Sequence, residues 1–147
     1  MIADSLPGFD AVVVHVGTNN VGDSDITRVA KFRQLVSRIM EKNSEIQVAF
    51  SAILPREVSL RKNDRWAEHN DEARGTNVIL QELCRKEGYG FIDGSRQSWS
   101  GLLMLDGVHF NKKGSKAAFM VLWQATGRRL RTRSRVAMQQ RRNTRSC

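Results

Sequence analysis

The stretch that decides the fold runs from Ala11 to Val16 and reads AVVVHV. Four of its six residues are valine, and Gly17 ends the run. A short apolar run rich in β-branched residues is typical of a buried strand in a parallel sheet that is covered on both faces. The stretch therefore predicts an α/β domain.

The residues after this strand predict a helix and then a second strand. Ser24 or Asp25 offers an N-cap, and an apolar stripe with helical spacing follows up to about Asn43. The stripe consists of Ile26, Val29, Phe32, Val36, Ile39 and Met40. The run from Ile46 to Ile53, IQVAFSAI, predicts the second strand, which Leu54-Pro55 ends.

A second helix is expected from Arg65 to Glu87, and its apolar stripe comprises Trp66, Ala73, Leu80, Leu83 and Cys84. Gly75-Thr76 weakens its middle, so two shorter helices are an alternative. A short strand from Tyr89 to Asp93 and a last helix from Gly114 to Leu122 complete the pattern. Such alternation predicts a parallel sheet between two layers of helices.

Charge divides the chain into a domain of residues 1–126 and a tail of residues 127–147. The domain carries 16 Lys and Arg against 15 Asp and Glu, whereas the tail carries eight Arg and no acid. We expect the tail to be disordered and able to bind RNA or DNA phosphates, although a tail without a role is equally compatible with the sequence. The arginines predicted to contact nucleic acid are Arg128, Arg129, Arg131, Arg133, Arg135, Arg141 and Arg142.

The cysteines and the hydropathy pattern indicate an intracellular protein, cytoplasmic or nuclear. Only Cys84 and Cys147 are present, which is too few for a disulfide framework. No apolar run approaches the length that spans a bilayer, and no secretory signal is visible at the N-terminus.

Two segments place polar side chains where parallel strands end, which is where such sheets bind ligands. The first is Gly17-Thr18-Asn19-Asn20, and the second is Asp106-Gly107-Val108-His109. An Asp three residues before a His can accept a hydrogen bond from one imidazole nitrogen, which leaves the other nitrogen free as a general base. The Asn19 amide can donate to a developing oxyanion.

These segments resemble two signature blocks of the SGNH/GDSL-type serine ester hydrolases: VVVHVGTNN resembles block III, and DGVHFNKKG resembles block V. AILPR and NVILQELCRKEGYGFID are similar to the elements between the blocks. The resemblance implies a three-layer α/β/α fold with a parallel, flavodoxin-like sheet. It also implies acyl ester hydrolysis without a metal or organic cofactor.

The same resemblance assigns roles to individual residues. It implies that His109 is the general base, that Asp106 orients it, and that Asn19 holds the oxyanion. Gly17 and Asn20 support the oxyanion loop, and Asn20 departs from the Asp that the family has there. His15 is instead expected to be a satisfied core histidine, and no spacing recommends a metal site.

The nucleophile is missing from this pattern. The family carries its catalytic Ser in a Gly-Asp-Ser motif after the first strand of the domain, well before block III, and here only nine residues precede Asp10. Gly22-Asp23-Ser24 spells the motif, but it follows no strand and precedes a helix, so we interpret Ser24 as an N-cap. We therefore expect an N-terminally truncated pseudoenzyme, inactive as written, whose first strand has an unpaired edge.

Two alternatives remain open at this point. The chain could be a non-catalytic module that binds RNA or other nucleic acid, since AILPR and the residues around DGVH most resemble the esterase-like domains of certain vertebrate retrotransposons. It could also be a gene fragment without an independent function. A small acyl ester is the expected substrate only if a Ser-bearing segment completes the domain.

Overall fold

The computed structural model describes residues 6, 8–17, 23–57, 66–95 and 98–124. Three parallel strands form one sheet in the order β1-β2-β3, namely β1 (Ala11–Val14), β2 (Gln47–Ser51) and β3 (Gly90–Ile92). Val12 lies opposite Val48, and Phe50 lies opposite Phe91. The predicted parallel sheet is therefore confirmed.

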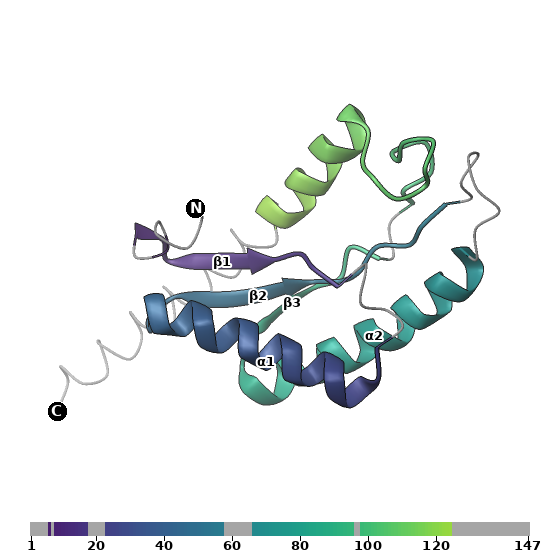
Figure 1. Cartoon of the computed structure of the whole chain (residues 1–147). Coiled ribbons are helices and arrows are strands. Elements are labelled where there is room, and N and C mark those ends of the chain that lie inside the picture. The colour runs from purple at the N-terminus through teal and green to yellow at the C-terminus, as the bar shows by residue number, and fades with distance from the viewer. Residues whose placement is uncertain (1–5, 7, 18–22, 58–65, 96–97, 125–147) are drawn as a thin grey trace, which may run out of the picture.

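Helices cover both faces of this sheet. Helices α1 (Asp25–Lys42) and α2 (Trp66–Glu87) lie together on one face, and a helix over residues 112–124 lies on the other (Figure 1). This arrangement is the three-layer α/β/α architecture that the alternating pattern predicted. Its main core lies between the sheet and the pair α1 and α2, where Phe50 is fully buried and meets the edge of the Phe32 ring.

Two details differ from the sequence expectations. The first strand ends at Val14, and only this residue of β1 is buried. Ile26 and Trp66 belong to the predicted apolar stripes but are 85% and 37% exposed, because each lies in the first turn of its helix, away from the core. Helix α2 continues unbroken through Gly75, so the single helix expected in this region is confirmed and the alternative of two shorter helices is wrong.

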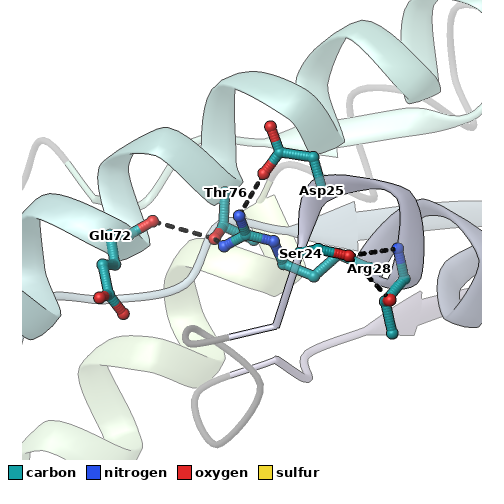
Figure 2. A network of polar contacts seen from close by, with 6 residues as sticks. Ser24, Asp25, Arg28, Glu72 and Thr76 are labelled. Carbon is teal, nitrogen blue, oxygen red and sulfur yellow. Dashed lines mark hydrogen bonds and ion pairs between the residues drawn. The ribbon is translucent and has the colours of Figure 1, made fainter.

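A buried arginine joins the two helices of one face, as Figure 2 shows. Arg28 of α1 donates to the Thr76 hydroxyl of α2 and forms an ion pair with Asp25. The Thr76 hydroxyl in turn donates to the Glu72 carbonyl at 2.9 Å, and Thr76 is almost completely buried. Thr76 thus has a tertiary role in the middle of α2, at the point where the sequence predicted a weakness.

No helix within the described ranges is both long enough and apolar enough to cross a membrane.

Candidate active site

The loop that carries Asp106 and His109 is a tight hairpin between β3 and the last helix. Leu103 and Phe110 form an antiparallel bridge, and the Met104 N–H donates to the His109 carbonyl at 2.7 Å. Gly107 turns the chain with a φ of 70°, in the left-handed region that favours glycine. The backbone therefore holds residues 106–109 in one defined conformation.

Asn111 fixes the base of this hairpin. Its amide nitrogen donates to the carbonyls of Gly101 and Leu103, at 2.9 and 3.1 Å. Its side-chain oxygen accepts the Gly114 N–H at 2.9 Å, as the N-cap of the helix over residues 112–124. Only glycine fits at position 114, because the Cβ atom of any other residue would collide with the Leu102 carbonyl oxygen.

Within the hairpin, the Asp106 carboxylate binds His109 through both of its oxygens. Oδ1 accepts the backbone N–H groups of Val108 and His109, at 2.9 and 3.0 Å. Oδ2 lies 2.8 Å from Nδ1 of the His109 imidazole. An ionised carboxylate can only accept hydrogen bonds, so Nδ1 carries a proton, and the lone pair of the neutral imidazole is on Nε2.

These hydrogen bonds lower the pKa of Asp106 well below the ordinary value of an aspartate. The largest cause is the Val108 N–H, followed by the His109 imidazole and the His109 N–H. Asp106 is therefore ionised throughout the neutral range. The His109 side chain is 76% exposed, so its second nitrogen is accessible to a reacting group.

Gly17 and this hairpin both contact the segment that follows β2. It follows β1 with a φ of 112°, and a Cβ atom would lie 2.9 Å from Cδ1 of Ile53. Ile53 lies two residues after the end of β2, and a few residues later the Glu57 N–H donates to the Gly107 carbonyl at 3.0 Å. This segment therefore connects the two regions in which the sequence predicted functional residues.

Asn19 and Asn20 lie outside the described residues, as do the arginines of the tail. The structure thus brings together His109, Asp106 and the segment that Gly17 contacts. The meeting of the Asn19 amide with His109 stays a prediction.

Three serine hydroxyls among the described residues have hydrogen-bond partners other than His109. Ser24 occupies the N-cap of α1, where its hydroxyl accepts the Thr27 N–H at 3.3 Å. The Ser95 hydroxyl donates to the Asp93 carboxylate at 2.6 Å. Ser51, which is 4% exposed, lies with its hydroxyl 2.7 Å from Nδ1 of His15. His15 therefore has a hydrogen-bond partner, as expected, but it is an exposed residue and not the core histidine that the sequence predicted, because it lies beyond the end of β1.

The sequence reading missed the side chains that hold the segment after β2. Asn70 and Asn77 of α2 each bind the backbone of this segment with both amide atoms. Their only signal in the sequence is a pair of polar residues seven positions apart on one face of a helix.

Comparison with known proteins decides the family. The sequence profile of the GDSL-like lipase/acylhydrolase family matches residues 2–117. The chain belongs to this family. No curated protein matches the chain significantly.

Solved structures of bacterial proteins share the fold of this GDSL-like chain. A protein of Bacteroides fragilis that is assigned as an acylhydrolase has a TM-score of 0.65 at 18% identity, over 84% of this chain and 64% of its own. A GDSL-like lipase from Bacteroides thetaiotaomicron has a TM-score of 0.63 at 16% identity, over 82% of this chain and 63% of its own.

An aryl esterase from M. smegmatis has a TM-score of 0.60 at 17% identity. That match covers 86% of this chain and 66% of the esterase. The GDSL-like chain thus spans less than two thirds of the length of each of these three proteins.

Proposed function

We propose that this chain supplies the acid–base half of a serine ester hydrolase that cleaves small acyl esters. The observation that carries the proposal is the hydrogen bond between Asp106 and Nδ1 of His109. It selects the tautomer in which Nε2 can take a proton, and the ionised carboxylate stabilises the imidazolium that forms. The family match supports the class of substrate.

In the proposed reaction, Nε2 of His109 removes the proton of a serine hydroxyl while its oxygen attacks the ester carbonyl. The Asn19 amide donates to the oxyanion of the tetrahedral intermediate. His109 then returns the proton to the leaving alkoxide, and an acyl-enzyme forms. Water, activated by the same imidazole, releases the acid and restores the serine.

The serine in this proposal comes from a further segment that pairs with β1. Among the described residues, β1 pairs only with β2, so its other edge is open to such a strand. Without that segment, we expect no ester turnover, because none of the described serine hydroxyls has a hydrogen bond to His109. The chain alone then acts as a pseudoenzyme with a preformed base.

Hydrolysis of p-nitrophenyl acetate tests the proposal. The chain as it stands is compared with a longer polypeptide that carries a Gly-Asp-Ser strand segment ahead of Met1. The longer polypeptide is expected to turn over the ester, and His109→Ala should lower kcat by on the order of a thousandfold or more. Ser24→Ala is the matched control and should leave kcat unchanged, because Ser24 caps α1. Turnover that is independent of His109 would overturn the proposal.

A second candidate function is nucleic-acid binding, which the eight arginines of residues 127–147 favour. We place such a protein in the cytoplasm or nucleus, in line with the presence of only two cysteines in the sequence. Binding to single-stranded RNA should weaken as salt rises, with a logarithmic slope of about −0.7 per phosphate neutralised. Deletion of residues after Gly127 should abolish it. Retention of RNA by the shortened chain would place the binding on the domain instead.

A gene fragment without an independent function is the third possibility carried over from the sequence. It requires that the purified chain unfold without cooperativity. A single cooperative transition in urea, followed by circular dichroism and by tryptophan fluorescence, would contradict it.

A further inference from the structure

The segment after β2 is held to α2 by two side-chain amides that take the place of a neighbouring strand. The Asn77 oxygen accepts the Ile53 N–H at 2.7 Å, and the Asn77 nitrogen donates to the Ile53 carbonyl at 2.9 Å. Asn70 does the same for Arg56, at 2.7 and 2.8 Å. Each asparagine thus satisfies both backbone groups of one residue in a segment that has left the sheet.

The two asparagines differ in what their partners contact. Arg56 immediately precedes Glu57, whose N–H donates to the Gly107 carbonyl at 3.0 Å. Gly107 is buried and immediately follows Asp106. The partner of Asn70, Arg56, is thus adjacent to the residue that bonds the hairpin. The partner of Asn77, Ile53, lies four residues before Glu57.

Burial makes this link stiff. Asn70 is only 9% exposed, and its two hydrogen bonds form away from most of the solvent. The Gly107 N–H is also engaged, with the Met104 carbonyl at 2.9 Å, so both backbone groups of Gly107 are held. A displacement of Arg56 would move the adjacent Glu57 N–H and therefore the Gly107 carbonyl that it binds. The neighbouring Asp106 carboxylate, which orients His109, would move with it.

We propose that Asn70 is a positioning residue for the Asp106–His109 pair, acting through Arg56, Glu57 and the Gly107 carbonyl. The catalytic meaning of this role rests on the proposed function of His109 as a base. The geometric claim does not, because the hydrogen bonds of Asp106 can be measured without any turnover.

NMR spectroscopy of the whole 15N-labelled chain tests the geometric claim. Asn70→Ala should speed hydrogen exchange of the Val108 and His109 amides by about tenfold, because their shared acceptor is no longer held in place. It should also shift the His109 imidazole away from a single Nδ1–H tautomer. Asn77→Ala is the matched control: it removes an equivalent pair of bonds and should change these signals less than about twofold.

Substitution of the next link separates positioning from a merely structural role. Glu57→Pro removes the N–H that donates to the Gly107 carbonyl. It leaves the two hydrogen bonds between Asn70 and the Arg56 backbone in place. If Asn70 acts through this bond, adding Asn70→Ala to Glu57→Pro should give no further change at Val108 or His109. Should Asn70→Ala fail to fold, Asn70→Asp, which keeps the acceptor for the Arg56 N–H, carries the comparison with Asn77→Ala.

Equal effects of the Asn70 and Asn77 variants on the hairpin, or additive effects of Asn70→Ala and Glu57→Pro, would overturn the proposal. In the longer polypeptide with a Gly-Asp-Ser segment, Asn70→Ala should lower kcat and leave KM unchanged. If Asn70→Ala disorders the hairpin but the longer polypeptide has no esterase activity, only the proposed function is wrong. If the longer polypeptide has His109-dependent activity but Asn70→Ala leaves the hairpin unchanged, only this inference is wrong.

Discussion

The Asp106 carboxylate holds three donors with two oxygens, and all three belong to residues within its own hairpin. This cluster is local in sequence, whereas the turn at Gly107 that shapes it also accepts a hydrogen bond from Glu57, outside the hairpin. Its chemical consequence is confined to one side chain: the His109 imidazole is held in a single tautomer. At the scale of residues, the site therefore depends on the charge state of Asp106.

The lowered pKa of Asp106 gives stability that depends on pH. A carboxyl group whose pKa is depressed in the folded state stabilises the fold above its unfolded pKa of about 3.9, and this contribution is lost as the pH falls. Asp106→Asn is therefore expected to lower the urea midpoint at neutral pH and to have a smaller effect at about pH 3. A loss of stability that is the same at both pH values would contradict this, and Asp71→Asn, an exposed surface aspartate, is the control.

His15 should show a pH dependence of its own. Partial desolvation of the imidazole lowers its pKa, so the fold favours the neutral form. The free energy of unfolding should then fall as the pH drops below about 6.5, because the unfolded chain takes up the proton first. His15→Gln keeps a donor for the Ser51 hydroxyl and removes the titration. Urea unfolding at about pH 7.5 and 5.5 should therefore show a smaller decrease for this variant than for the unmodified chain.

At the scale of elements, α2 does more than cover the sheet. One of its faces buries Leu80 and Leu83 in the core, while Asn70, Asn77 and Thr76 bind the segment after β2 and α1. These polar contacts explain why a helix with Gly75 in its middle is continuous. Tertiary bonds on both sides of the glycine outweigh its helix penalty of about 1 kcal/mol.

The contact between Arg28 and Thr76 can be tested by removing the hydroxyl alone. Thr76→Val keeps the shape of the side chain and leaves a buried cationic donor without its acceptor, which should cost about 1–3 kcal/mol of unfolding free energy. In an Arg28→Met background, the same substitution should cost much less, because that donor is gone. Chemical denaturation of the four proteins gives both numbers. Equal costs in the two backgrounds would show that the hydroxyl stabilises α2 only through the Glu72 carbonyl.

At the scale of the whole molecule, the described part of the sheet is covered unevenly. The β1 edge is open, and two aromatic side chains of the helix over residues 112–124 stack on each other at 6.0 Å while remaining exposed. Phe119 is 61% and Trp123 is 66% exposed. Paired exposed aromatic rings form an apolar patch rather than the scattered single residues that are common on surfaces.

This pair should bind a hydrophobic dye in the folded protein. The double substitution Phe119→Ser and Trp123→Ser is expected to reduce the fluorescence of bound anilinonaphthalene sulfonate at neutral pH. Ile26→Ser, which removes an isolated residue that is 85% exposed on α1, should have little effect. The expectation is wrong if the Phe119/Trp123 double variant and Ile26→Ser reduce the dye fluorescence equally.

The sequence by itself determined the order of strands and helices, an N-cap at Ser24 or Asp25, and the pairing of Asp106 with His109. These features depend on spacing over a few residues, and hydrophobic periodicity and turn chemistry act over that range. Only the tertiary structure decided which residues hold the hairpin. Glu57 and Gly107 are 50 positions apart, and Arg28 and Thr76 are 48 apart. Such contacts form where chain segments cross, and a polar side chain on a helix carries no local sign of the backbone that it will bind.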